Sequence, residues 1–110
     1  MPPFERWDVI AVPFPYVERP IQQRRPALVV ATKLGGPLDL LWVLMITSAT
    51  NPRWPEDVEI DDYEGAGLPI ASVVRTAKIA TIEARAASRL GMISEQSAAR
   101  VAAILRHRIS

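Results

Sequence analysis

Short apolar runs separated by turn-forming residues dominate most of the chain. The runs at residues 7–14 (WDVIAVPF), 27–32 (ALVVAT) and 40–47 (LLWVLMIT) are rich in β-branched and large apolar side chains, which favours strands. The run 40–47 is the most apolar of the three. At this length, between turn formers, it suits a central strand better than a helix, and we expect it to anchor the core.

Four weaker strand patterns follow, at residues 57–60, 70–74, 78–82 and 90–93. The stretches 16–26 and 48–55 are polar, contain prolines and are typical of loops. Pro13 and Pro15 place the end of the first strand at a sheet edge or a bulge, because proline cannot donate to a strand ladder.

The C-terminal segment predicts a helix. Ser94 is a good N-cap residue, and Glu95 lies in the first turn, where the helix dipole favours an acid. Apolar residues then recur at helical spacing, at Ala98, Val101, Ala102, Leu105 and Ile109. Strands followed by one helix predict a mainly β fold of the α+β class. We expect one domain over residues 1–110, a bent antiparallel sheet or small barrel with the helix packed on it.

Composition narrows the chemistry that this domain can carry. The chain has 110 residues, no cysteine and one histidine, His107. These counts exclude disulfides, thiolate metal sites and catalysis by paired histidines. No apolar run approaches the roughly 20 residues of a membrane span, and the N-terminus lacks the apolar segment of a secretory signal. We therefore expect a cytoplasmic protein with no membrane association, metal or cofactor.

Charge is distributed unevenly along the chain. Residues 56–64 hold six of the 12 acidic residues and no base, so 13 bases face six acids elsewhere. All of these bases except Lys33 and Lys78 are arginines, whose planar guanidinium fits phosphate and carboxylate oxygens. The bias indicates phosphate or acidic-peptide partners, and GC-rich codon usage is an equal alternative.

Three pairs of polar residues flank the predicted strands. Arg24-Arg25 precedes the strand 27–32, Thr47-Ser48 ends the strand 40–47, and Arg75-Thr76 follows the strand 70–74. Strand ends are where a rigid sheet presents groups to a ligand. If these ends converge, guanidinium groups and hydroxyls surround one site, an arrangement that suits a phosphodiester.

Four segments together resemble the MazF/PemK family of toxins from toxin–antitoxin pairs: WDVIAVPFPYVE, QQRRPALVV, LMITSAT and SVVRTAKIATIE. The resemblance runs from about residue 4 to residue 105. It implies an SH3-like bent barrel with a C-terminal helix and a homodimer whose RNA groove crosses the subunit interface. It further implies metal-independent cleavage of single-stranded RNA through a 2′,3′-cyclic phosphate, and neutralisation by a cognate antitoxin.

Carried over residue by residue, the resemblance implies four catalytic residues: Arg25, Thr47, Ser48 and Arg75. Four further residues are candidate substrate contacts: Arg24, Arg53, Trp54 and Lys78. Trp54 is a candidate for stacking on a base, with packing of its loop or a dimer contact as the alternatives. A structural ion pair is the alternative for Arg25, and backbone-satisfying hydroxyls are the alternative for Thr47 and Ser48.

The sequence departs from its relatives at two positions. Trp7 stands where relatives usually have glycine, and Ala77 stands where some PemK-like relatives carry an aspartate proposed to transfer a proton. Glu18 is then a candidate general base, with a solvated loop acid as its alternative. We expect Trp7 and Trp42 to lie in the core. We interpret the run 56–64 as a solvated strand and turn, or as a surface that repels RNA.

Two other functions stay open. One is a degenerate member that binds RNA or antitoxin without cutting. The other is an inhibitor of the related CcdB type, which binds gyrase through a C-terminal Trp and Ile. The ending RHRIS has no tryptophan and does not favour that second mode.

Overall fold

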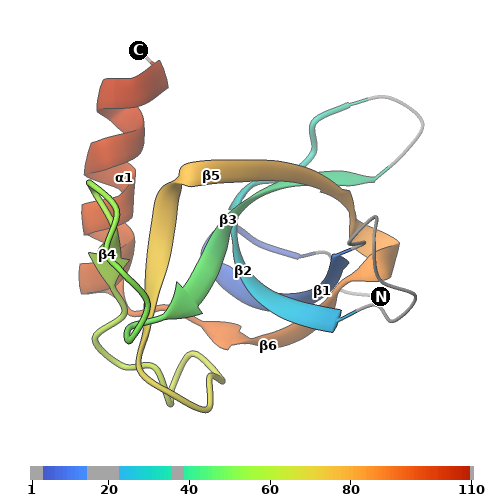
Figure 1. The fold of residues 1–110 in the computed structure, drawn as a ribbon. Helices are drawn as coiled ribbons and strands as arrows, with labels where there is room; N and C mark the ends of the chain where they lie inside the picture. Colours follow the sequence, from blue (N-terminus) through green and yellow to red (C-terminus); the bar gives the residue numbers. More distant parts are fainter. Residues whose placement is uncertain (1–3, 15–22, 36–38, 110) are drawn as a thin grey trace.

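The computed structural model describes residues 4–14, 23–35 and 39–109. Six antiparallel strands form one sheet in the order β4-β5-β3-β2-β1-β6. The strands are β1 (Asp8–Phe14), β2 (Gln23–Ala31), β3 (Leu40–Ser48), β4 (Val58–Glu59), β5 (Ser72–Glu83) and β6 (Ser88–Met92). A short 3₁₀ helix, η1 (Ala84–Ala86), separates β5 from β6, and the chain closes with α1 (Glu95–Ile109). The sheet curls into an open barrel with α1 beside it (Figure 1), which confirms the predicted fold class.

Strand β5 bends sharply along its length (Figure 1). Leu44 of β3 pairs with Ile79, whereas the next residue, Met45, pairs with Arg75, so residues 76–78 have no partner on β3. The first half of β5 then pairs with β4, and the second half runs on to η1. The two strands predicted at 70–74 and 78–82 are therefore two arms of one bent strand.

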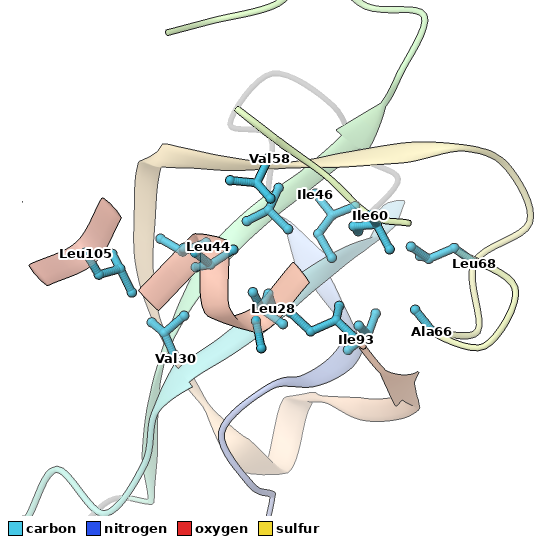
Figure 2. Packing of buried hydrophobic residues seen from close by; sticks show 14 residues of the cluster. Leu28, Val30, Leu44, Ile46, Val58, Ile60, Ala66, Leu68, Ile93 and Leu105 are labelled. Carbon is cyan, nitrogen blue, oxygen red and sulfur yellow. The ribbon is translucent and has the colours of Figure 1, made fainter. Parts of the chain in front are cut away.

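Alternation along the strands buries both faces of the sheet. In β2, Leu28 and Val30 belong to one apolar cluster, and Ala27 and Val29 belong to another. The first cluster fills the space between the sheet, the segment 58–68 and α1, as Figure 2 shows. The second lies on the opposite face and includes Ala84 of η1.

The predicted central strand is at the core, with one exception. Leu44 is fully buried, but Trp42 is 43% exposed, so the prediction of a core tryptophan at position 42 is wrong. Trp42 alternates onto the face of Leu44 and Ile46, and the buried cluster on that face includes no β3 residue before Leu44. Trp7, the other tryptophan expected in the core, is partly buried against the first cluster.

The start of α1 agrees with the predicted N-cap. The Oγ of Ser94 accepts a hydrogen bond from the backbone N–H of Ser97 at 3.1 Å. The same hydroxyl donates to the Asp61 carboxylate at 2.6 Å, and the Ser97 hydroxyl donates to that carboxylate at 3.1 Å. These hydrogen bonds tie the helix to the segment after β4. In the part of the chain that the structure describes, no helix is long and apolar enough to cross a bilayer.

The predicted loop 16–26 is partly wrong, because β2 begins at Gln23 and includes Arg24 and Arg25. These residues are held in the strand by β1, whose Val12 and Pro13 pair with Arg25 and Arg24. The ladder between β2 and β3, in contrast, ends at Ala27 and Met45. Pro26 has no N–H with which to continue that ladder. The two strand ends therefore separate beyond Ala27.

Candidate active site

An open groove of about 510 Å³ lies where β2 and β3 separate. Both strand ends line it, together with the loop after β3 and the segment before β5. The lining residues are Arg24, Arg25, Pro26, Ile46, Thr47, Ser48, Asn51, Leu68, Pro69, Ile70 and Ser72. Extending the antiparallel register of β2 and β3 by two residues sets Arg25 across from Thr47. Two predicted site segments therefore meet in this groove.

The Thr47 hydroxyl is oriented by a residue that sequence reasoning did not single out. The side-chain amide of Asn51 donates to the Thr47 Oγ1 at 2.6 Å, and the Asn51 backbone N–H donates to the Ser48 carbonyl at 3.1 Å. Because the Thr47 oxygen accepts this bond, its own hydrogen remains to donate to a ligand. The only available signal was an amide residue four positions after Thr47 in a turn-forming stretch.

Ser48 also lines the groove, next to Thr47. Its Oγ lies 2.8 Å from the Thr50 Oγ1 and accepts the Thr50 backbone N–H at 3.2 Å. These contacts close the turn after β3. The turn fixes the positions of both hydroxyls that the strand end contributes.

Strand β2 contributes two arginines, Arg24 and Arg25, to the lining of the groove. Arg25 is half-buried and Arg24 is exposed. The Arg24 guanidinium donates to the Ala11 carbonyl at 2.9 Å and to the Ser88 Oγ at 2.8 Å, so β1 and β6 hold it in place. A cation fixed by a rigid sheet is suited to binding an anion without reorganisation.

Arg75 does not line this groove, contrary to the expectation that it meets Arg25 and Thr47. Its guanidinium donates to the Asp57 carboxylate at 3.0 Å and to the Pro52 carbonyl at 2.9 Å. The Asp57 side chain is 2% exposed and the Arg75 side chain 11% exposed. The Arg75 guanidinium also lies 4.1 Å from the centroid of the Trp54 ring. Arg75 is therefore part of a buried ion pair that supports the loop between β3 and β4.

The other predicted contacts lie around the groove or apart from it. Arg53 forms an ion pair with Glu59 at 3.6 Å and lines a different cavity, of about 640 Å³, between β4 and α1. Lys78 and Ala77 are exposed at the bend of β5 and are not among the residues that line either cavity. Glu18 lies outside the described residues.

Most of the acidic run is engaged with other groups. Glu56 pairs with Arg108, Asp57 with Arg75 and Glu59 with Arg53. The interpretation of this run as solvated is wrong for Asp57, because the bend of β5 brings Arg75 onto it. Asp61 is exposed, and the hydrogen bond from Ser94, followed by that from Ser97, lowers the pKa of its carboxyl.

The backbone at Trp7 has a conformation that favours the glycine usual in relatives. Its φ is 79°, in the left-handed region that favours glycine. The backbone is held there from both sides, because the Trp7 N–H donates to the Val29 carbonyl and the Ile93 N–H donates to the Trp7 carbonyl. The ring lies partly buried on the first apolar cluster. Packing of the ring therefore accompanies an unfavourable backbone conformation.

Comparison with known proteins assigns the chain to a family. The family model for PemK-like, MazF-like toxins of type II toxin-antitoxin systems matches residues 5–109. The chain belongs to this family. A search of curated proteins gives no significant match. In the described part of the chain, no group of three or more His, Asp or Glu side chains could hold a metal ion.

The fold matches solved structures of the MazF type. A chain in the form II crystal structure of MazE–MazF from Deinococcus radiodurans superposes with a TM-score of 0.71 at 18% identity, covering 100% of this chain and 98% of that one. A chain in form III from the same organism gives 0.70 at 17% identity, with 96% and 94% covered. These matches extend over nearly the whole length of each chain and show a MazF-like fold.

Proposed function

We propose that this protein is an endoribonuclease toxin that cuts single-stranded RNA in the groove between β2 and β3 without a metal ion. The observation that carries the proposal is that Arg25, Thr47 and Ser48 line the same groove. Membership of the PemK/MazF family supports it. Among the described residues, the groove lining contains two arginines and no acid, so its charge suits a phosphodiester.

The proposed reaction is an internal transfer at phosphorus. The ribose 2′-oxygen attacks the adjacent phosphorus, the bond from phosphorus to the 5′-oxygen breaks, and the products are a 2′,3′-cyclic phosphate and a 5′-hydroxyl. Negative charge builds up on the phosphoryl oxygens, where Arg25 stabilises it. Thr47, oriented by Asn51, and Ser48 donate hydrogen bonds to the same phosphate.

Proton transfer needs a group from outside this lining. The part of the lining that the structure describes holds no carboxylate and no histidine, and a guanidinium is a poor base at neutral pH. A base accepts the proton of the 2′-hydroxyl, and an acid donates a proton to the 5′-oxygen as it leaves. Glu18, outside the described residues, is a candidate for this base, and a homodimer would allow a second copy of the chain to contribute to the groove.

We also propose a cognate antitoxin as the protein partner. The family is one of toxins from type II toxin-antitoxin systems, and the similar solved structures are MazE–MazF complexes. An acidic, disordered antitoxin segment that folds over Arg24 and Arg25 would cover the groove and block RNA.

Incubation of the purified protein with a long single-stranded RNA in EDTA tests the proposal. We expect the parent to cut RNA, to leave a matched DNA intact and to yield 2′,3′-cyclic phosphate ends. Arg25→Ala and Thr47→Ala should each slow cleavage by about 100- to 1,000-fold, the usual effect of losing one preorganised donor. Arg106→Ala is the control, because Arg106 is an exposed arginine of α1 and is not among the residues that line the groove. Equal cleavage of DNA would contradict the mechanism, and binding of RNA without cleavage would indicate a degenerate member.

A further inference from the structure

The loop between β3 and β4 contains an unfavourable backbone conformation next to the groove. Residues 54–57 form a tight turn in which the Asp57 N–H donates to the Trp54 carbonyl at 3.2 Å. Pro55 is at the second position and Glu56, with a φ of 67°, at the third, which is the pattern of a type II turn. The third position of such a turn favours glycine, so glutamate is a poor choice for it.

Four interactions hold this turn in place. The Asp57 Oδ2 accepts the Trp54 N–H at 2.9 Å and the Arg75 guanidinium at 3.0 Å. The Thr76 hydroxyl donates to the Glu56 carbonyl at 2.9 Å, and the Glu56 carboxylate pairs with Arg108. A disfavoured residue fixed so completely by its surroundings is typical of ligand-binding segments.

The turn holds the aromatic ring of Trp54 at the surface. Trp54 is 43% exposed, and the Arg75 guanidinium lies 4.1 Å from its centroid. The ring is therefore supported by a cation that is itself fixed by Asp57, while much of the tryptophan remains accessible. An aromatic side chain held in one orientation loses little freedom when a planar ligand stacks on it.

Trp54 is not among the residues that line the groove, but it lies close to one of them along the chain. Asn51 lines the groove and orients Thr47, and Trp54 follows it by three residues, which span at most about 11 Å. A nucleotide whose phosphate is in the groove has neighbouring bases that could extend over this distance. In single-stranded RNA such bases are unpaired and expose their faces for stacking.

We propose that Trp54 is a stacking platform for one unpaired nucleobase that neighbours the phosphate in the groove. In this assignment, Arg75 and Asp57 are positioning residues that hold the ring, and neither contacts the scissile phosphate. The proposal rests on the proposed function, because it takes single-stranded RNA as the ligand. It differs from the role implied by the family resemblance, in which Arg75 acts on the phosphate itself.

The test measures binding separately from cleavage. A short oligoribonucleotide with 2′-O-methyl groups at every position cannot form the cyclic phosphate, so its affinity reports binding alone. Trp54→Ala should weaken its binding about 10- to 100-fold, the range expected for the loss of one stacked base. Trp54→Phe should retain most of the affinity. Trp42→Ala is the matched control, because Trp42 is also 43% exposed and should leave binding unchanged.

An oligonucleotide with an abasic site identifies the stacked base. At one position, removal of the base should weaken binding to the parent as much as Trp54→Ala does, and it should have no further effect on the Trp54→Ala variant. Arg75→Gln should also weaken binding of the oligonucleotide. Adding it to Trp54→Ala should cause little further loss of affinity. Thermal melting of each variant confirms that it is folded.

The outcomes separate the platform from the nuclease. If the parent cuts RNA but Trp54→Ala binds the methylated oligonucleotide as tightly as the parent, the platform is refuted and the nuclease stands. The same holds if Trp54→Ala weakens only the binding of an antitoxin. If the parent neither binds nor cuts any RNA, both proposals fail.

Discussion

Replacing Asp57 with asparagine should destabilise the protein strongly, because it leaves the Arg75 cation buried beside a neutral amide. The Asp57 and Arg75 side chains are 2% and 11% exposed, and their charged groups lie 3.0 Å apart. Removing one partner of a buried pair typically costs about 3 to 5 kcal/mol. Arg75 would keep its hydrogen bond to the Pro52 carbonyl and its contact with the Trp54 ring. We therefore expect a loss at the lower end, about 3 kcal/mol.

Urea and thermal unfolding of three variants measure this effect. At roughly 4 °C per kcal/mol for a domain of this size, Asp57→Asn should lower Tm by about 12 °C. The double variant Asp57→Leu/Arg75→Met should recover most of the stability, because it leaves no unpaired charge in the core. Glu59→Gln is the control. It breaks the exposed pair with Arg53, whose side chains are 44% and 69% exposed, and it should cost less than about 1 kcal/mol.

The reasoning is refuted if Asp57→Asn stays within about 0.5 kcal/mol of the parent, or if the double variant is no more stable than the single one. Either result would mean that the Asp57–Arg75 pair contributes little to folding and that Arg75 is available for another role. The expected result has a consequence for enzymology. A loss of activity in Arg75→Ala would then report the collapse of the loop at 52–57 and would not identify a catalytic residue.

Two further predictions concern the backbone and the acidic run. Because Trp7 has a φ of 79°, Trp7→Gly should be more stable than Trp7→Ala by about 1 kcal/mol in urea unfolding, and the opposite order would contradict the assigned strain. The lowered pKa of Asp61, caused first by the hydrogen bond from Ser94, predicts stabilisation that is present above the ordinary pKa of 3.8 and is lost as the pH falls through the folded-state pKa. Asp61→Asn should therefore be less stable than the parent at pH 7, with a gap that narrows below about pH 4 in thermal melts. A gap independent of pH would disprove the linkage.

The strands were predictable where apolar residues cluster, and less so where pairing depends on a neighbour. The runs that became β1 and β3 identify themselves by composition. The start of β2 does not, because Gln23–Pro26 is polar and is held extended by β1. Trp42 was misplaced for a related reason. Its large apolar side chain predicts burial, but the buried cluster on its face of the sheet includes Leu44 and Ile46 and does not reach back to position 42.

Part of the site was predictable because it depends on the order of the strands alone. Arg25 and Thr47 belong to strands that are consecutive in the chain and antiparallel in the sheet, so their ends meet by topology. The contacts of Arg75 depend instead on the turn at residues 54–57, which brings the Asp57 carboxylate against the Arg75 guanidinium of β5. No pattern in the sequence distinguishes Asp57 from the exposed acids beside it.

The pairing of Asp57 with Arg75 changes the interpretation of the acidic run at residues 56–64. As a solvated surface it would repel RNA from one face, but Glu56, Asp57 and Glu59 are each paired with an arginine. The paired arginines come from the loop, from β5 and from the end of α1. The groove lining, as far as the structure describes it, holds Arg24 and Arg25 and no acid. The run thus pairs with three arginines outside the groove lining, and Arg24 and Arg25 are the arginines of the lining at the proposed phosphate site.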